Sequence, residues 1–327
     1  MIDAPLRMRR LGRSRVRVTE LSLGGAAIGN LFTNVDDDTA QATVDAAWRG
    51  GIRTFDTAPH YGLGLSERRF GMALRDRPRE AYVISTKVGR LLVPLAPPHG
   101  RDPEGFAVPA SHARVFDFSA EGVRRSLDAS LQRLGLDRVD IVLIHDPDDH
   151  GEQVLRETYP ALERLRAEGV VTAIGVGMNQ AGMLARFVTD TDVDVVLEAG
   201  RFTLLDQSAA DSLLPVALER GVAVIAGGVF NSGVLAAPST DAHFDYQPAP
   251  AATLARALAL EGECARFGVP LRAAAARFPL RHPAVVSVLI GARTPTEITD
   301  ALRMHSVGLP EGLWDALAAA GADGETG

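Results

Sequence analysis

The sequence predicts a single (β/α)8 TIM barrel, in which residues 1–327 form one domain around a closed ring of eight parallel strands. Three observations lead to this prediction. Short runs of β-forming residues alternate with longer stretches rich in Ala and Leu. Several of the short runs are almost continuously apolar, which is typical of parallel strands covered by helices. Glycine also stands repeatedly between a helical stretch and the next apolar run.

Eight apolar runs are the candidate barrel strands. They recur along the chain as a pattern of elements, although no sequence motif repeats at a fixed period. Each run is followed by a segment long enough for a crossover helix. We expect the strands at Leu21–Gly24, Ile52–Phe55, Tyr82–Ser85, Val139–Ile144, Ala173–Val176, Val193–Glu198, Val222–Ala226 and Val285–Ile290.

Helical periodicity fills the intervals between these runs. In Ser119–Leu134, apolar residues recur three or four positions apart, so one face of the predicted helix is apolar. Gly135 follows directly, as a glycine does at many helix ends. The same junction follows Tyr159–Ala167 at Gly169 and Leu213–Arg220 at Gly221.

Two segments stand outside the strand and helix alternation. Residues 1–20 contain Leu6–Arg10 and Val16–Glu20 on either side of a glycine turn, which predicts an N-terminal β-hairpin that closes the bottom of the barrel. The connection Leu91–Phe118, after the third strand, is long and rich in proline and glycine. Because loops after barrel strands surround the active-site mouth, we expect residues 91–118 to form an active-site loop.

An open doubly wound sheet is the alternative fold. That fold carries a glycine-rich phosphate-binding loop after its first strand. The segment Gly62–Glu67 has glutamate where the third glycine should stand, and Gly175–Gln180 fails in the same way. The barrel therefore remains the predicted fold.

Composition and charge limit the classes of function. The formal net charge is −7 and no run is rich in Lys or Arg, so we expect neither nucleic acid nor an anionic membrane as partner. Cys264 is the one cysteine, which excludes an internal disulfide. Met1–Arg17 lacks the apolar segment of a secretory signal, and no stretch approaches the roughly 18 apolar residues of a membrane span. We expect a cytoplasmic protein.

Four polar residues stand at or just after predicted strand ends. Asp56 and Lys87 end the second and third strands, His145 ends the fourth, and Tyr61 follows Asp56 by five residues. In a (β/α)8 barrel the carboxyl ends of the strands converge on one pocket. We therefore expect these four side chains to meet.

Together the four side chains suit the interconversion of a carbonyl and an alcohol. A tyrosine hydroxyl has a reference pKa of about 10, and a nearby ammonium lowers it. A carboxylate beside the ammonium compensates its buried charge, and a histidine orients the substrate oxygen. Such a set is a general acid–base centre. Taken singly, each residue also has a purely structural interpretation, such as a helix cap, a packed ring or a core histidine.

A metal site and a reactive thiol are two further possibilities. His145–His150 is dense in potential zinc ligands, but Pro147 interrupts the run, and an acidic loop is the favoured interpretation. We expect no metal. Cys264 has acidic neighbours that disfavour its thiolate, so a structural role is favoured.

Three segments resemble the motifs of the aldo-keto reductase superfamily: Gly51–Gly62, Ser85–Gly89 and Ile144–Pro147. The resemblance extends from about Leu11 to Leu302. It implies an NAD(P)-dependent oxidoreductase in which Tyr61 gives or takes the proton, Asp56 and Lys87 tune Tyr61, and His145 orients the substrate.

Finer features resemble one branch of that family. They are Leu23–Asn30, Tyr61–Arg68 and Gly227–Gly233. The branch contains D-threo-aldose 1-dehydrogenase (L-fucose and galactose dehydrogenases), and pyridoxal 4-dehydrogenase is similar to it. The resemblance implies oxidation of a sugar hemiacetal, a small-molecule substrate. Pyridoxal oxidation and general aldehyde or ketone reduction are alternatives, and a nucleotide-binding regulatory subunit is an alternative of another class. The oligomeric state stays open.

The resemblance also implies where the nicotinamide binds. Asn179 falls where the family places a carboxamide-binding asparagine, and Gly227 falls where many members stack a tyrosine on the nicotinamide. Ala199 replaces a frequent glutamine. Phe202 or Phe230 could supply the missing apolar surface.

The segment after the last strand favours NAD over NADP. Gly291 and Ala292 replace a common Lys-Ser pair, and Glu297 stands where NADP-preferring relatives often have arginine. A carboxylate there repels the 2′-phosphate and can accept hydrogen bonds from ribose hydroxyls. Arg293 and the helix N-terminus near Thr294 argue for phosphate binding, so NADP remains possible.

Overall fold

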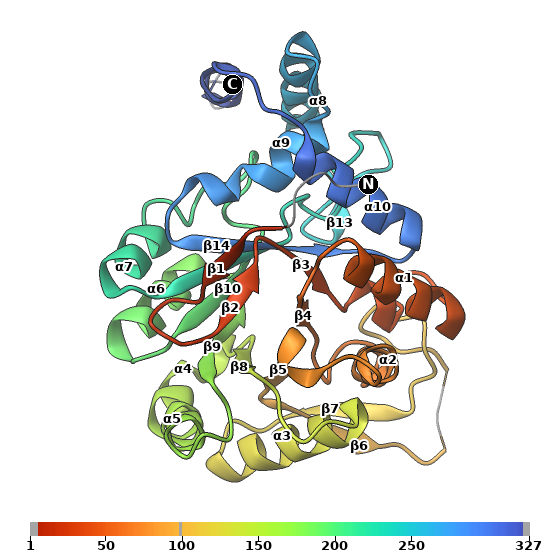
Figure 1. Ribbon diagram of the computed structural model, residues 1–327, viewed down its shortest axis with the longest axis vertical. Helices are drawn as coiled ribbons and strands as arrows, with labels where there is room; N and C mark the ends of the chain where they lie inside the picture. The colour runs from red at the N-terminus through yellow and green to blue at the C-terminus, as the bar shows by residue number, and fades with distance from the viewer. Residues whose placement is uncertain (1–5, 98–99, 323–327) are drawn as a thin grey trace.

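The predicted (β/α)8 barrel is confirmed by the computed structural model, which describes residues 6–97 and 100–322. Eight strands pair in parallel around a closed ring, in the order β10-β11-β14-β3-β4-β5-β8-β9 (Figure 1). Residues 1–5 of the predicted hairpin, 98–99 of the predicted loop and 323–327 of the predicted domain lie outside the described residues. The strands are β3 (Leu21–Gly24), β4 (Thr54–Asp56), β5 (Val83–Val88), β8 (Ile141–His145), β9 (Ala173–Met178), β10 (Val195–Ala199), β11 (Ala223–Gly227) and β14 (Val285–Gly291).

Helices cover the outside of this ring (Figure 1). The pair α8 (Ala251–Arg266) and α11 (Leu313–Ala322) pack on each other at the top of the view. The remaining α-helices are α1 (Asp37–Arg49), α2 (Leu65–Leu74), α3 (Ala120–Leu134), α4 (Gly151–Gln153), α5 (Tyr159–Ala167), α6 (Ala181–Asp190), α7 (Leu213–Arg220), α9 (Leu271–Arg277) and α10 (Pro295–Ser306). Short 3-10 turns occur at η1 (Ala27–Gly29), η2 (Arg79–Ala81), η3 (Asp148–His150) and η5 (Pro279–Arg281), and η4 (Val154–Thr158) is a π-helical turn.

The helix ends follow the signals in the sequence. Ser119 caps α3 by accepting a hydrogen bond from the Gly122 amide at 3.0 Å. Gly135 ends the same helix in the left-handed conformation, with φ of 63°, where a side chain would be strained. Gly221 ends α7 in the same way. These residues start and stop α3, and stop α7, at the point where the chain turns toward the barrel.

The N-terminal hairpin fills the bottom of the barrel. Strands β1 (Met8–Arg10) and β2 (Arg17–Thr19) pair antiparallel, and Leu11, Val16 and Val18 are buried in the core cluster inside the ring. A side chain at Gly12 would collide with the Asp194 carbonyl, just before β10, so glycine lets the turn approach the strands closely. The other members of this inner core are Ile141, Leu143, Ala173, Val195, Leu197, Ala223, Ile225 and Val286. The larger apolar cluster lies between the strands and the helices.

The loop after the third barrel strand is more ordered than its composition suggests. Its two ends pair as an antiparallel hairpin of β6 (Arg90–Pro94) and β7 (His112–Phe116). Phe106, in the segment between these strands, is buried, whereas Phe116, the last residue of β7, is exposed. A further small hairpin, β12 (His243–Phe244) with β13 (Gln247–Pro248), lies in the loop after β11. Both hairpins extend loops that follow barrel strands.

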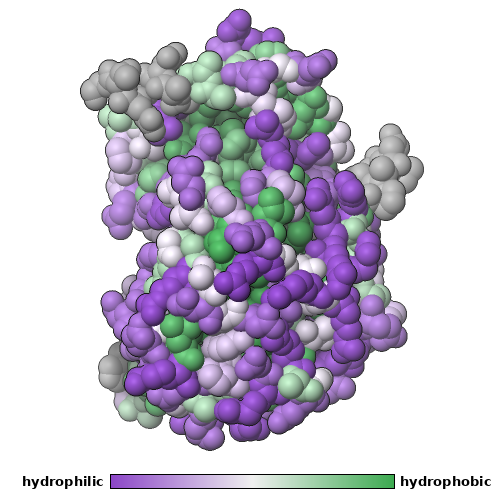
Figure 2. Space-filling model, turned by 90° about the vertical axis from the view of Figure 1, so that its left-hand side faces the viewer, coloured by the Kyte–Doolittle hydropathy of each residue, from purple (hydrophilic) through white to green (hydrophobic). Residues whose placement is uncertain are grey.

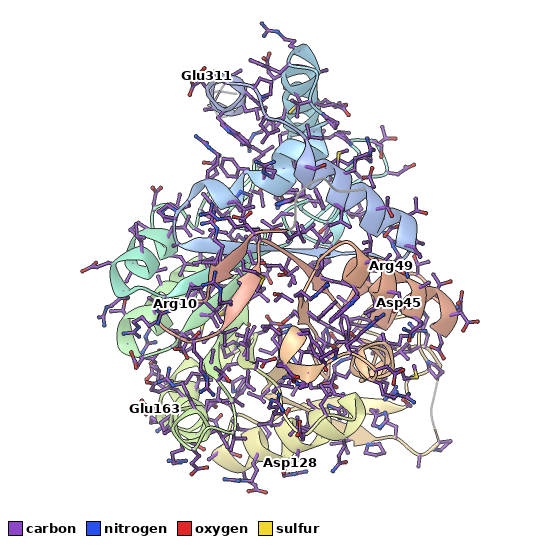
Figure 3. The ribbon with its side chains drawn as sticks, viewed as in Figure 1. Arg10, Asp45, Arg49, Asp128, Glu163 and Glu311 are labelled. Carbon is purple, nitrogen blue, oxygen red and sulfur yellow. The ribbon has the colours of Figure 1, made fainter. Side chains whose placement is uncertain are left out.

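The outer surface is mostly hydrophilic on the face drawn in Figure 2, with a larger hydrophobic area in its upper part. In the described part of the chain, no helix combines the length and apolar character needed to cross a membrane. Charged side chains surround the barrel in Figure 3, where the labelled residues are Arg10, Asp45, Arg49, Asp128, Glu163 and Glu311.

Candidate active site

The ends of three adjacent barrel strands bring the four predicted residues together. Asp56 ends β4, Lys87 lies one residue before the end of β5, and His145 ends β8. These strands are neighbours in the ring, so their carboxyl ends open on the same mouth. Tyr61 lies in the turn between β4 and α2.

Lys87 is the centre of the cluster. Its Nζ donates hydrogen bonds to Asp56 Oδ2 at 2.6 Å, to the Thr57 carbonyl at 3.1 Å and to Tyr61 Oη at 3.1 Å. The three donors of the ammonium are therefore all used. Ser85 Oγ donates to the second oxygen of Asp56 at 2.7 Å. Asp56 and Lys87 are both fully buried, so this network holds one geometry.

Lys87 is also the one lysine in a sequence whose other 33 cationic side chains are arginines (34 Lys and Arg in all). A compact ammonium fits three acceptors in a closed space, whereas a planar guanidinium does not. A single lysine among so many arginines is thus a sequence signal that points to a functional role for Lys87.

The charges of the cluster decide its protonation. Burial would lower the pKa of Lys87, but Asp56 and Tyr61 outweigh it and raise that pKa. Burial raises the pKa of Tyr61 to about 12, and Lys87 opposes this effect without reversing it. The expected lowering by the ammonium is therefore real but smaller than the desolvation of the phenolate. At neutral pH the cluster holds an ammonium beside a neutral phenol.

His145 is a neutral imidazole beside this pair. Burial, and then the nearby Arg90 and Lys87 cations, hold the pKa of His145 well below its usual range. The Tyr61 ring meets the His145 ring edge-on, with centroids 5.8 Å apart. A neutral imidazole at this position can donate one hydrogen bond to a substrate oxygen.

Two further aromatic side chains line the cluster. His60 lies edge-on against His145, with centroids 5.7 Å apart, and burial together with surrounding cations lowers the pKa of His60 to about 2. Phe106, from the loop after β5, lies 6.2 Å from the Tyr61 ring. Phe116, from the same loop, lies elsewhere and stacks on Phe118. His60 was missed, although it precedes Tyr61 directly.

A cavity of about 700 Å³ lies at the barrel mouth, and the four clustered side chains are not among its lining residues. Its size suits a large organic ligand. Asn231 Oδ1 is buried at this cavity and has no hydrogen-bond partner among the described residues, so it offers an unused acceptor. The lining of the cavity includes Ala27 and Asn179. It also includes Arg272, Arg293 and Asp300, which define the part of the cavity that we call its far end.

Comparison with known proteins assigns the chain to a family. The model of the Aldo/keto reductase family matches residues 20–321. The chain belongs to the aldo-keto reductase family. It is therefore an oxidoreductase, and members of this family use nicotinamide cofactors.

Three relatives of this aldo-keto reductase have stated activities. The chain is 44% identical to D-threo-aldose 1-dehydrogenase from Pseudomonas sp, over 93% of this chain and 94% of the relative. It is 41% identical to pyridoxal 4-dehydrogenase from Microbacterium luteolum, over 96% and 97%. It is 32% identical to L-galactose dehydrogenase from Arabidopsis thaliana, over 90% and 86%.

Solved structures confirm the fold. The glycerol dehydrogenase from Gluconobacter oxydans superposes with a TM-score of 0.77 and 24% identity, covering 97% of this chain and 95% of that one. The holo form of an aldo-keto reductase from Bacillus halodurans has a TM-score of 0.75 and 23% identity, covering 96% of both chains. At these identities the likeness concerns the barrel alone.

Four of the six residues predicted to contact the cofactor line the cavity of this aldo-keto reductase: Asn179, Gly291, Arg293 and Glu297. The Asn179 amide nitrogen donates to the Ala199 carbonyl at 2.8 Å, which fixes its orientation. Together with the unused acceptor of Asn231, these groups fit a nicotinamide dinucleotide. The other two predicted residues, Gly227 and Thr294, are not among the described residues that line the cavity.

Those two residues have other positions. Gly227 ends β11 in the barrel wall, and its neighbour Gly228 lines the cavity instead. Thr294 caps α10 by accepting from the Glu297 amide at 3.2 Å. Gly227 and Thr294 each directly neighbour a residue that lines the cavity, Gly228 and Arg293 respectively. The sequence does not determine which of two adjacent residues faces the cavity.

The two suggested phenylalanines also separate. Phe230 lines the cavity. Phe202 is buried against Phe278, with ring centroids 5.1 Å apart, so it belongs to the helix-layer core.

The far end of the cavity carries two arginines that are already paired. The Arg293 guanidinium lies 3.7 Å from Glu297, and the Arg293 amide donates to the same carboxylate at 2.7 Å. Arg272, on α9, lies 3.1 Å from Asp300. Arg272 and Asp300 were not predicted from the sequence, because only packing of α9 against α10 brings them together. In the described residues, no cluster of His, Cys, Asp or Glu could hold a metal ion.

Proposed function

We propose that this chain is an aldose 1-dehydrogenase, which oxidises the C1 hemiacetal of a cyclic sugar to a lactone with a nicotinamide as hydride acceptor. The observation that carries the proposal is Tyr61 Oη at 3.1 Å from a buried ammonium, beside a cavity that fits a dinucleotide. The 44% identity to D-threo-aldose 1-dehydrogenase supports the substrate class.

The four clustered side chains divide the proton chemistry. A bound oxidised nicotinamide would supply the acceptor for the hydride that leaves C1. The phenolate form of Tyr61 takes the proton of the C1 hydroxyl at Oη, and Lys87 Nζ stabilises this phenolate by donating a hydrogen bond to it. Asp56 holds Lys87 in place at 2.6 Å. The neutral His145 donates a hydrogen bond to the same substrate oxygen, which orients C1. The reverse reaction uses the same groups with Tyr61 as the acid.

The loop 91–118 supplies one wall of the proposed sugar site. Phe106 offers an apolar face beside Tyr61, and the Phe32 amide donates to the Gly105 carbonyl at 2.9 Å, which ties this loop to the loop after β3. We infer that residues 91–118 border the substrate and that Phe106 packs against the sugar ring.

A second candidate substrate follows from the 41% identity to pyridoxal 4-dehydrogenase. Pyridoxal closes to an internal hemiacetal through its neighbouring hydroxymethyl group, so its oxidation is the same chemistry on an aromatic ring. The alternative of a general aldehyde reductase requires an open carbonyl.

A substrate panel tests these proposals. Purified protein is assayed with D- and L-aldoses, pyridoxal and simple aldehydes, with NAD and NADP, in both directions, by absorbance of the reduced nicotinamide. We expect aldose-dependent reduction of NAD to be the fastest reaction. Faster turnover of pyridoxal would select the second candidate. Cofactor binding without turnover of any substrate would contradict an enzyme and favour a regulatory subunit.

We also propose that NAD is the preferred cofactor. The 2′-phosphate that distinguishes NADP needs unpaired cationic groups. At the far end of the cavity Arg293 and Arg272 each face a carboxylate, Glu297 and Asp300 respectively. The two carboxylates neutralise the cations and repel the phosphate.

Glu297→Arg is expected to improve the use of NADP relative to NAD by about 10- to 100-fold, because it replaces a repulsive charge by an attractive one worth roughly 1.4–3 kcal/mol. The measurement is kcat/KM for each cofactor at a saturating fixed substrate. Glu297→Gln is the matched control, since it keeps an acceptor for the Arg293 amide and removes only the charge. A wild-type ratio already favouring NADP by tenfold would contradict the NAD assignment.

A further inference from the structure

The loop between β5 and α3 contains a buried ion pair that neither core packing nor substrate contact explains. Arg114, on β7, binds Asp102 through two hydrogen bonds of 2.6 and 2.8 Å. The side chains are 8% and 1% exposed. Burying such a pair costs desolvation, so it stabilises a fold less than an apolar pair of the same size. What it supplies is a fixed position for the guanidinium.

Arg114 also donates a hydrogen bond to His60, the residue next to Tyr61. Its Nη2 donates to the His60 carbonyl at 3.0 Å. The same guanidinium lies 5.6 Å over the Phe106 ring, which in turn meets the His60 ring edge-on at 5.1 Å. Backbone and side chain of His60 are thus both held from the hairpin side.

The opposite side of this turn is held by close packing. A side chain at Gly29 would lie 3.0 Å from the Tyr61 carbonyl carbon and oxygen, so η1 already touches the Tyr61 backbone. The turn carrying Tyr61 therefore lies between η1 and Arg114. Loss of either contact would let the turn shift relative to Lys87.

The other strand of the hairpin, β6, contacts the neighbour of His145. Arg90, the first residue of β6, donates to Asp146 Oδ2 at 2.6 Å, and Asp146 directly follows His145. Each strand of the hairpin thus places an arginine, near the hairpin's base, on the residue beside one member of the cluster. A loop that only covered the site would not need these two contacts.

We propose that Arg114 is a positioning residue, which holds the His60 carbonyl from the hairpin and thereby keeps Tyr61 Oη at hydrogen-bond distance from Lys87 Nζ. This inference rests on the proposed role of Tyr61 in proton transfer. It assigns the base of the 90–116 hairpin to the acid–base step rather than to substrate binding alone. Because a displacement of about 1 Å can cost about 100-fold in rate, loosening this contact should mainly lower kcat.

The test separates positioning from stability with a double variant. Arg114→Met alone leaves the Asp102 carboxylate buried without its partner, so it can fail to fold. Arg114→Met/Asp102→Leu removes both charges and should restore the melting temperature, but it does not restore the bond to His60. We expect kcat to fall 10- to 100-fold in the double variant, while Kd for the reduced cofactor stays within about twofold. Arg114→Lys should recover part of kcat.

Lys87 offers a probe that needs no turnover. As the one lysine of the sequence, it gives a single lysine Cε signal in protein labelled with 13C-lysine. We expect this signal, and its titration, to change in the double variant as Tyr61 moves away. We also expect the limb of the kcat profile for oxidation that rises with pH to move to higher pH. Arg186→Met is the matched control, because it breaks exposed pairs with Glu152 and Asp190 on the outer helix layer.

A folded double variant with wild-type kcat and an unchanged Lys87 signal would overturn the positioning role. If Tyr61→Phe is inactive while the double variant keeps full activity, the proposed function stands and only this inference fails. If Tyr61→Phe keeps wild-type turnover, the role of Tyr61 fails, and the inference fails with it.

Discussion

Replacing Tyr61 by phenylalanine is expected to lower kcat by about 10²- to 10⁴-fold, the usual contribution of a positioned general acid or base. The substitution removes the one hydroxyl that contacts Lys87 Nζ at 3.1 Å and leaves the ring against Phe106 and His145. The cavity that fits the dinucleotide is unchanged. Cofactor affinity should therefore survive, and the loss should appear in the chemical step.

The measurement is kcat with a C1-deuterated sugar, whose isotope effect shows whether hydride transfer limits turnover. Kd for the reduced cofactor is measured in parallel by fluorescence. Tyr159→Phe is the matched control, because the Tyr159 hydroxyl binds the Asp192 amide on the outer helix layer. Turnover at the wild-type rate by Tyr61→Phe, with an isotope effect present, would contradict the assignment.

Lys87→Met is expected to act on both activity and stability. Lys87 lowers the pKa of Tyr61 against a larger rise caused by burial, and the result is a pKa of about 12. Without the ammonium this pKa rises further. In the oxidation direction Tyr61 acts as the base, so each unit of rise lowers the phenolate fraction about tenfold at a given pH. The limb of the kcat profile for oxidation that rises with pH should therefore move to higher pH.

The same substitution leaves Asp56 buried without its cation. Losing one partner of a buried pair costs about 3–5 kcal/mol in the free energy of unfolding. Urea unfolding measures this loss. Lys87→Arg is the comparison, because it keeps the charge but cannot place three donors on Asp56, Thr57 and Tyr61 in the closed site. A Lys87→Met profile that does not move, or moves to lower pH, would contradict the role of the ammonium.

The sequence predicted local structure well where the signal was local. The helix predicted over Ser119–Leu134 and the glycine that ends it are confirmed, and Ser119 proves to be the cap that precedes Ala120, since a cap needs only neighbouring residues. The first residues of strands were predicted less accurately: the strand predicted at Ile52–Phe55 begins at Thr54 in the structure. Where a strand begins depends on the neighbour it pairs with, which periodicity does not report.

The loop 91–118 shows where composition misleads. Proline and glycine suggested an irregular connection, yet β6 and β7 pair across it, and Arg114 with Asp102 is buried inside it. The pairing partners lie about 20 residues apart. Neither the antiparallel register nor the ion pair leaves a periodic trace in the sequence.

Sequence alone determined which chemical groups meet. Asp56, Lys87 and His145 each stand at the end of an apolar run, and parallel strands in a ring must bring such ends to one mouth. Tertiary structure decided how those groups behave. Burial sets the pKa of Tyr61 above its usual value despite Lys87, and the pairing of Arg272 with Asp300 shapes the far end of the cavity. Desolvation and ion pairing depend on contacts between residues that are distant in the chain. Their effects on pKa and charge are therefore set only once the barrel has folded.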